Sequence, residues 1–219
     1  MTRLAKQSVN TYDYLMTKRR YTLGQRAVSQ EETRRRIVEA TVDLHQEIGP
    51  RDTTISAIAE KAQVQRLTVY RHFPDEAALF AACTSHWFEQ NRPPVPSEWD
   101  DQEGHARTLA ALHLLYSYYR KTERMWTFAC RDEPDLPAMH EPMEKFRNYL
   151  ASVRDDLVKH LKPKRAATGH VHLTLGHALQ FSTWQSLARQ QGDWEIAELV
   201  CAWLNGALDS NASSKAGRK

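Results

Sequence analysis

The sequence predicts an all-α protein, and three observations support that fold class. Along most of the chain, apolar residues recur every three or four positions, which is the spacing of one face of a helix. No segment alternates apolar and polar residues over the length of a strand. Only 8 of the 219 residues are glycine and 9 are proline, which excludes collagen-like and low-complexity chains. We therefore expect about nine helices.

Residues 1–28 show no sustained period and are interpreted as a basic N-terminal extension. The run Ser-Gln-Glu-Glu at Ser29 has the form of a capping box, so the first regular helix is expected to begin there. Gly49 and Pro50 are expected to end it. Its buried face is expected to contain Ile37, Ala40, Leu44 and Ile48.

Two short helices separated by a tight turn are expected next. Thr54 is the expected N-cap of the first, which is rich in small residues, and residues 64–70 form the second. The second helix keeps Val64 and Val69 toward a core and presents polar and cationic side chains on its other face. Residues 29–75 therefore have a helix-turn-helix pattern, whose second helix could enter the major groove of DNA.

The remaining chain is also helical in its periodicity. Asp75 is the expected N-cap of a connecting helix at residues 76–90, and the proline-rich residues 91–101 mark the expected domain boundary. Residues 91–210 are expected to form a second helical domain, followed by a disordered tail at 211–219. Its expected helices are centred on residues 109–119, 124–130, 139–161, 169–190 and 193–208.

Charge and cysteine usage limit the functions to consider. Residues 1–36 carry nine basic against three acidic residues, which suits a nucleic acid, although a merely solubilising tail has the same composition. No apolar run approaches the roughly 18 residues of a membrane span, and no signal peptide is visible. The cysteines form no paired motif, so we expect no disulfide framework and a cytoplasmic location. These cysteines are Cys83, Cys130 and Cys201.

Residues 30–83 resemble the DNA-binding domain of the TetR family of transcriptional regulators. The resemblance is carried by TTISAIAEKA at residues 53–62, by Val64, and by TVYRHFPD at residues 68–75. It covers about a quarter of the chain. It implies an N-terminal helix-turn-helix domain followed by a helical domain that binds a ligand and dimerises.

The resemblance implies that residues on and beside the second short helix contact double-stranded DNA. Arg66 and Gln65 suit base contacts, since arginine pairs with guanine and glutamine with adenine. Tyr70 and His72 match phosphate-contacting positions. The alternative is an ordinary solvent-exposed helix face. The full expected DNA-binding set is Thr54, Gln65, Arg66, Leu67, Thr68, Tyr70, Arg71, His72 and Arg26.

Three positions depart from the family's pattern. Gln63 occupies a turn position where the family usually has glycine. Leu67 replaces a small residue, and it could either meet a thymine methyl group or simply pack. Glu76 replaces a phosphate-binding lysine and would repel phosphate. Basic side chains of the N-terminal segment could compensate by reaching the DNA backbone or minor groove: Lys18, Arg19, Arg20, Arg26 and Arg34 to Arg36.

The resemblance also implies an effector pocket in residues 91–210, for a small molecule that is mainly apolar or aromatic. Aromatic and methionine residues at helical spacing are more often core residues, which is the alternative. The candidates are Tyr116, Tyr119, Trp126, Met143, Phe146 and Trp184. No cofactor, metal or enzymatic activity is expected, because catalytic motifs are absent and the histidines at 170, 172 and 177 lack a well-spaced third ligand.

The sequence is therefore interpreted as a ligand-responsive repressor that binds palindromic operator DNA as a homodimer. The expected dimer contact involves about residues 169–190 and 193–208, and no membrane partner is expected. Its apolar residues would be Leu175, Leu179, Leu187, Leu199, Trp203 and Leu204. In one alternative, the C-terminal domain serves protein interaction or dimerisation without an effector. In another, a ligand-binding or catalytic helical protein retains a vestigial helix-turn-helix.

Overall fold

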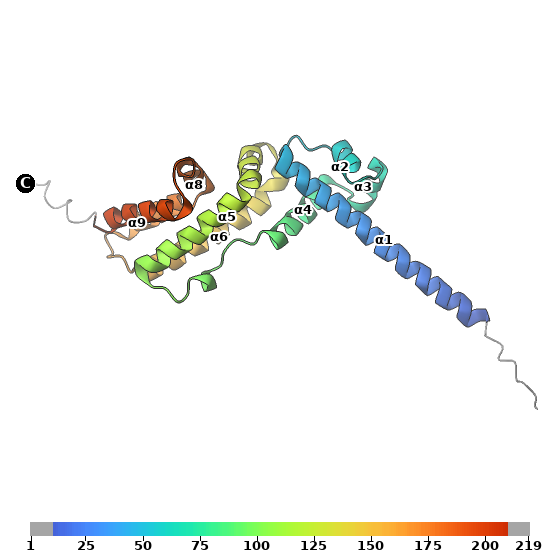
Figure 1. Cartoon of the computed structure of the whole chain (residues 1–219), viewed down its shortest axis with the longest axis horizontal. Helices are drawn as coiled ribbons and strands as arrows, with labels where there is room; N and C mark the ends of the chain where they lie inside the picture. The colour runs from blue at the N-terminus through green and yellow to red at the C-terminus, as the bar shows by residue number, and fades with distance from the viewer. Residues whose placement is uncertain (1–10, 210–219) are drawn as a thin grey trace, which may run out of the picture.

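The computed structural model describes residues 11–209, with side chains described for residues 27–209. Within that part of the chain there are nine α-helices, two 3₁₀ helices and no strand, so the all-α prediction is confirmed. The short helices α2 and α3 lie at one end of an elongated molecule and α7 to α9 at the other, with α5 and α6 running between them (Figure 1). The expected disordered tail, residues 211–219, lies outside the described residues.

The N-terminal end is built from α1 (Thr11–Glu47), α2 (Ile55–Lys61), α3 (Arg66–His72) and α4 (Glu76–Gln90). Ile37 and Val69 are fully buried where these helices meet. Thr54 and Asp75 cap α2 and α4 as predicted, accepting hydrogen bonds from Ala57 N at 3.2 Å and Ala78 N at 2.7 Å. Local hydrogen bonds at Thr54 and Asp75 therefore cap α2 and α4, and the buried core packs against the α2–α3 unit.

The prediction that the first helix begins at Ser29 is wrong. The helix α1 begins at Thr11 and continues through Ser29, whose carbonyl oxygen accepts a hydrogen bond from Thr33 Oγ1 at 2.8 Å. Glutamate and glutamine also favour helix interiors, so a capping-box sequence does not by itself mark the residue at which a helix begins. Ile48, expected in the buried face, is 39% exposed, because α1 ends at Glu47 and Ile48 belongs to the following turn.

The C-terminal end contains five α-helices. They are α5 (Gly104–Asp132), α6 (Pro137–Leu161), α7 (Thr168–Ala178), α8 (Phe181–Leu187) and α9 (Asp193–Asp209). The 3₁₀ helix η1 (Pro96–Glu98) precedes α5, and η2 (Glu133–Asp135) separates α5 from α6. No helix in the described part of the chain combines the length and the apolar character that crossing a membrane requires.

Two helix boundaries correct the sequence prediction. The two helices expected around 109–119 and 124–130 are one helix, α5, since no glycine or proline lies between them. The single helix expected at 169–190 is broken at Gln180, whose backbone is extended. The hydroxyl groups of Tyr116 and Tyr119 donate to the carbonyl oxygens of Ala178 and Leu179, at 2.9 and 2.8 Å. These bonds from α5 satisfy carbonyls that a continuous helix would have used.

Candidate nucleic-acid interface and ligand cavity

The turn between α2 and α3 has a left-handed residue at Gln63, the position where the family usually has glycine. Gln63 has a φ of 55°, a conformation that costs a non-glycine residue on the order of 1 kcal/mol. Backbone bonds from Gln63 N to Glu60 O (3.0 Å) and from Val64 N to Ala59 O (2.9 Å) close the turn. The helix α3 then begins at Arg66 rather than at Val64, because Gln65 is its extended N-cap.

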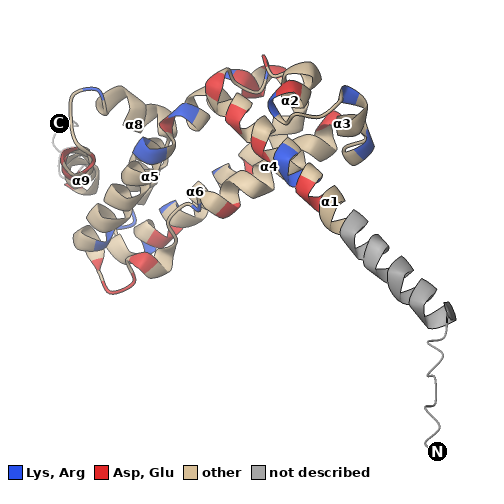
Figure 2. Ribbon diagram, turned by 45° about the vertical axis from the view of Figure 1, so that its right-hand side comes forward, with Lys and Arg blue, Asp and Glu red and all other residues tan. Residues whose placement is uncertain are grey.

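One side of α3 faces the core and the other faces solvent. Val69 is fully buried and Phe73 is 2% exposed. On the opposite side, no hydrogen bond or ion pair joins the side chains to other described residues. We call this surface the α3 face; it consists of Gln65, Arg66, Leu67, Tyr70 and Arg71, all exposed. Figure 2 shows its basic residues at the tip of the helix-turn-helix end.

Other expected DNA contacts lie around the α3 face. Thr54, at the start of α2, lines the same depression as Arg66 and Tyr70. Glu76 also lines this depression, so an acidic residue lies beside the cationic surface. Thr68 is only partly exposed. The side chain of Arg26, like those of Lys18, Arg19 and Arg20, lies outside the described residues.

His72 is partly exposed, but one nitrogen of its ring faces the protein. Its Nε2 atom is buried and has no hydrogen-bond partner among the described residues. Burial lowers the pKa of His72, and the nearby Arg71 and Arg34 lower it further, so the ring is largely neutral at pH 7. A neutral imidazole with one buried nitrogen is poorly suited to the phosphate contact that the resemblance implies.

Arg34 and Arg36 of α1 contact the α2–α3 segment, whereas Arg35 pairs within α1. Arg34 donates to the carbonyl of His72 at 3.2 Å and covers the ring of Phe73, whose centroid is 4.3 Å from the guanidinium carbon. Arg36 donates to Ala62 O at 3.3 Å. Arg35 pairs with Glu32 and Glu39 at 2.7 and 2.6 Å. Each of these three side chains is therefore engaged within the chain, and their contact with DNA stays a prediction.

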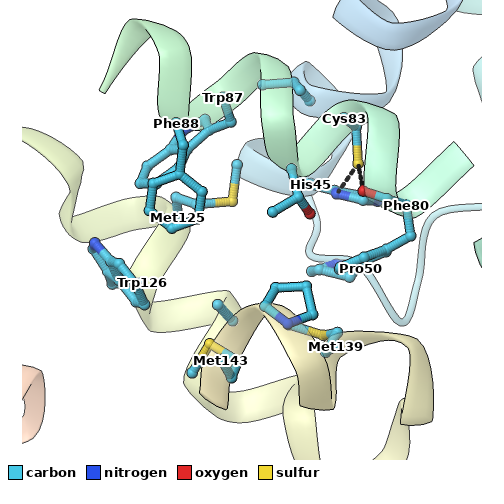
Figure 3. A pocket seen from close by; sticks show the side chains of 14 residues that line it. His45, Pro50, Phe80, Cys83, Trp87, Phe88, Met125, Trp126, Met139 and Met143 are labelled. Carbon is cyan, nitrogen blue, oxygen red and sulfur yellow. Dashed lines mark hydrogen bonds between the residues drawn. The ribbon is translucent and has the colours of Figure 1, made fainter. Parts of the chain in front are cut away.

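A cavity lies between the helix-turn-helix and the C-terminal helices, and we call it the junction cavity (Figure 3). Its cavity volume is about 60 Å³, and it is partly open to solvent. Its walls come from the end of α1 and the turn after it, and from α4, α5 and α6. The lining residues are Val42, His45, Pro50, Phe80, Cys83, Thr84, Trp87, Phe88, Met125, Trp126, Ala129, Met139, Pro142 and Met143.

The junction cavity has no charged wall. None of its lining residues is an aspartate, glutamate, lysine or arginine. Burial lowers the pKa of His45 to about 4, so this imidazole is neutral at pH 7. Burial raises the pKa of the Cys83 thiol to about 12, so it stays protonated, with its sulfur 3.8 Å from His45 Nδ1. The cavity therefore suits an uncharged, largely apolar molecule.

Of the six residues expected to line an effector pocket, Tyr119, Trp126, Phe146 and Trp184 contact one another through their rings, but not all six line the junction cavity. Trp126 and Met143 line the junction cavity, and Phe146 lines an adjoining groove between α4 and α6. Tyr116, Tyr119 and Trp184 are fully buried and do not line the cavity. Their polar atoms are used internally: the two hydroxyls bind α7–α8 carbonyls, and Trp184 Nε1 donates to Asp193 Oδ1 at 3.0 Å.

Sequence reasoning missed the cavity walls contributed by α1 and α4. Val42, Phe80 and Trp87 have the ordinary helical spacing of core residues, which does not reveal a cavity. His45 is the one available signal, because it is a polar residue beside Leu44 in the buried face of α1.

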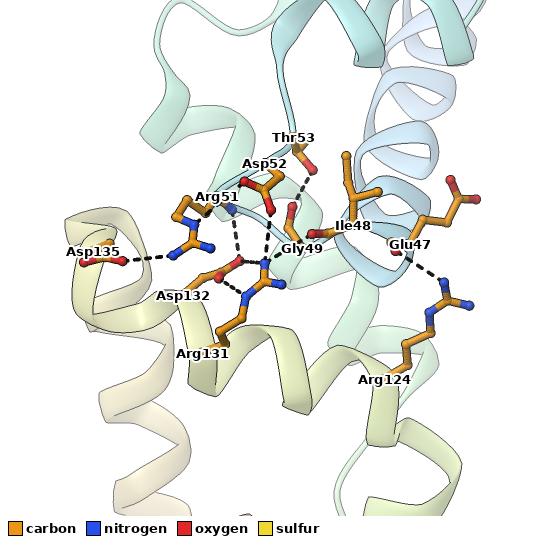
Figure 4. Close-up of polar contacts among 10 residues, drawn as sticks. All are labelled: Glu47, Ile48, Gly49, Arg51, Asp52, Thr53, Arg124, Arg131, Asp132 and Asp135. Atoms are coloured by element: carbon orange, nitrogen blue, oxygen red, sulfur yellow. Dashed lines mark hydrogen bonds and ion pairs between the residues drawn. The ribbon is translucent and has the colours of Figure 1, made fainter.

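A buried polar contact joins the two ends of the molecule beside the cavity (Figure 4). Asp132, at the end of α5, is completely buried and accepts a hydrogen bond from the backbone N–H of Arg51 at 3.1 Å. It also pairs with Arg131, which donates to the carbonyl of Ile48 at 3.2 Å. Gly49 has a φ of 93°, and a Cβ there would collide with Arg131 and Asp132. We call this group of residues the junction contact; it consists of Ile48, Gly49, Arg51, Arg131 and Asp132.

The electrostatics of the junction contact favour the charged form of Asp132. Burial opposes ionisation of the carboxyl group. The bonds from Arg131 and from the backbone of Arg51 outweigh this penalty, and the pKa of Asp132 is lower than usual. The α1–α2 turn and the end of α5 are therefore held together by a carboxylate that is ionised at neutral pH.

Comparisons with known proteins agree with this geometry. Residues 37–83 match the family model described as bacterial regulatory proteins, tetR family. No curated protein matches the chain. Within the described residues, no three histidine, cysteine, aspartate or glutamate residues gather where they could hold a metal ion.

Several solved structures share the fold at low sequence identity. A TetR-like transcriptional regulator from Rhodococcus sp. RHA1 is 17% identical with a TM-score of 0.59, covering 80% of this chain and 95% of its own. A putative transcriptional regulator from Pseudomonas aeruginosa PAO1 is 14% identical with a TM-score of 0.61, covering 82% and 91%. A tetR-family regulator from Streptomyces coelicolor is 17% identical with a TM-score of 0.58, covering 85% and 86%.

These likenesses concern the fold, whereas the family match concerns the helix-turn-helix itself. The matched residues contain α2, the turn at Gln63 and α3 with its exposed cationic face. Through this N-terminal domain, the chain is similar to the bacterial regulatory proteins of the tetR family, and its fold is that of the solved transcriptional regulators above.

Proposed function

We propose that this chain is a ligand-responsive repressor that binds palindromic operator DNA as a homodimer and releases it when a small, uncharged, mainly apolar effector binds. The α3 face carries the proposal. Its arginine, glutamine and tyrosine side chains are exposed and bind no other described side chain. A helix that presents such groups beyond a rigid turn can place them at base edges and phosphates in the major groove.

The exposed residues differ in the roles we assign to them. Arg66 and Gln65 are the proposed base readers, because they open the helix and form bidentate hydrogen bonds. Tyr70 and Arg71 are proposed phosphate contacts. Thr54 uses its oxygen to accept from Ala57 N, which leaves its O–H free to donate to a phosphate. Contacts of this second kind set the register of the protein on DNA.

The proposed domains separate DNA binding from effector binding and dimerisation. Residues 29–75 bind DNA, residues 76–90 connect, and residues 91–210 dimerise and bind the effector together with side chains from α1 and α4. Because α4 contributes to both the helix-turn-helix core and the junction cavity, it is the helix through which the two functions communicate.

Homodimerisation is proposed through the apolar face that α7 and α9 leave uncovered. Leu173, Leu199 and Trp203 are 73%, 39% and 37% exposed, and exposed large apolar groups of this kind mark association surfaces. Three residues expected at this interface are instead part of the protomer's own core: Leu175, Leu179 and Leu204, each no more than 1% exposed. The proposed interface is therefore narrower than the sequence pattern indicated.

Effector control is proposed through the junction cavity. Its walls include both ends of the molecule, so a bound molecule would favour one relative position of α1 and α6 over another. Release of DNA requires that the effector bind the DNA-incompetent arrangement more tightly than the competent one. The alternative without an effector leaves this cavity without a role.

Selection of duplexes from a randomised library with the full-length protein tests the proposal. We expect enrichment of a sequence with two half-sites, salt-dependent binding, and much weaker binding when one half-site is removed. Arg66→Ala is expected to lower affinity by about 5- to 150-fold and to relax sequence choice at one position in each half-site.

The matched control is Arg35→Ala, which also removes an arginine, but one of α1 that pairs with Glu32 and Glu39. Its selectivity should equal that of the wild-type protein. Failure to enrich any sequence, or unchanged selectivity in Arg66→Ala, would contradict the proposed role of the α3 face.

A further inference from the structure

Leu67 is the large apolar side chain that the described structure leaves most exposed. It is 76% exposed, more than Val28 or Leu173, and it lies in the first turn of α3. The sequence left open whether Leu67 packs against the protein. The structure shows that it does not, so the protein fold alone gives no reason for a leucine here.

The surroundings of Leu67 indicate what could cover it. Within the α3 face its neighbours are Arg66, Tyr70 and Arg71, so the leucine is an aliphatic group on a surface that otherwise carries two cations and a tyrosine ring. The exposed apolar residues of α7 and α9 lie at the other end of the molecule (Figure 1). An apolar protein partner would have to bury the unpaired cations, whereas DNA neutralises them with phosphates.

The position on the helix is also specific. Residues near the N-terminus of a recognition helix approach the base edges, while later residues lie nearer the backbone. In the major groove, the apolar group that a base edge presents is the C5-methyl group of thymine.

We propose that Leu67 is a specificity-determining residue that contacts the C5-methyl group of one thymine in each operator half-site. This inference rests on the proposed function. It adds an apolar readout to the polar readout by Arg66 and Gln65, and it discriminates thymine from cytosine, which lacks the methyl group. It also explains why the surface retains an exposed leucine between two arginines.

The test replaces thymine by uracil, which removes the methyl group and leaves every hydrogen-bonding atom in place. The probe is the duplex enriched from the randomised library, with uracil introduced at one thymine position at a time, symmetrically in both half-sites. We expect one position at which the wild-type protein loses about fifteenfold in affinity. Each buried methyl group contributes about a fourfold change, and the substitution removes one methyl group from each of the two half-sites.

The variant Leu67→Ala completes the comparison. It should bind the thymine duplex more weakly than wild type and should not distinguish thymine from uracil at that position. Leu67→Met should retain part of the distinction. Val28→Ala, which shortens another strongly exposed apolar side chain on α1, should behave as wild type. Equal melting temperatures of the variants would show that the folds are intact.

The outcomes separate this inference from the function on which it rests. If the protein selects an operator but uracil has no effect at any position, or has the same effect in Leu67→Ala as in wild type, the readout by Leu67 is refuted and DNA binding stands. If no duplex is selected at all, both fail.

Discussion

The α3 face and the junction cavity differ in the exposure and charge of their side chains. On the α3 face, polar and cationic side chains project into solvent and bind no other described residue. In the junction cavity, the walls are apolar, and the ionisable groups among them, His45 and Cys83, are held neutral by burial. The difference reflects the proposed ligands: a polyanion is met by exposed charge, and an uncharged molecule by a surface that excludes water.

The two regions are joined by the junction contact, and breaking that contact has the largest expected effect. Asp132→Ala removes a buried carboxylate, leaves the Arg51 N–H without its partner and takes from Arg131 one of its acidic partners. We expect the free energy of unfolding to fall by about 2–3 kcal/mol, measured by urea denaturation. Since the variant leaves the α3 face intact, any DNA it binds should be the sequence that wild type selects.

The control for this variant is Asp135→Ala. Asp135 also pairs with Arg51, at 3.3 Å, but both side chains are largely exposed. Its loss should cost no more than about 0.5 kcal/mol. Equal losses for the two variants would show that the burial of Asp132 is not what stabilises the junction.

The absence of charge in the junction cavity can be tested with two ligands that differ only in charge. A neutral aromatic compound that fills the cavity should stabilise the protein by about 2.7 kcal/mol at a hundredfold excess over its Kd. Its carboxylate analogue should not, because the lining offers no cation to replace the lost hydration. Thermal unfolding with each compound measures this. A larger shift with the carboxylate would contradict an uncharged effector.

The smallest of these effects concerns the neutral imidazole of His45. The pKa of His45 is lowered by burial to about 4, against an ordinary value of 6.5. Between these values the unfolded chain binds a proton that the folded chain does not, so stability falls as the pH falls. From pH 7 to pH 5 this one group should cost about 2 kcal/mol.

His45→Gln should remove that share of the pH dependence. Urea denaturation at the two pH values measures the difference between variant and wild type. His140→Gln, which replaces an exposed histidine, should leave the pH dependence unchanged. An unaltered pH dependence in His45→Gln would mean that the imidazole is not kept neutral.

Local features of the chain could be predicted from the sequence with good accuracy near α3. The caps at Thr54 and Asp75 and the left-handed turn at Gln63 each depend on a few neighbouring residues. Features that depend on distant contacts could not. The break at Gln180 coincides with bonds from Tyr116 and Tyr119, which are about sixty residues away in the sequence.

The cavity shows the same limit. Its residues come from four helices, and their spacing is that of any buried helix face. Arg34 shows the same limit for a charged residue. Its charge suggested a DNA contact, whereas in the structure it contacts Phe73 and the His72 carbonyl within the protein.

By itself, the sequence determined the helical class, the helix-turn-helix and the polar side of α3, because helix period, capping and turn conformation are set by residues close in the chain. Only the tertiary structure decided that Leu67 stays in solvent, that one ring nitrogen of His72 and the side chain of Arg34 face the protein, and that the cavity opens at the junction of the two ends. Those outcomes depend on which helix faces meet, and contacts between distant segments determine that.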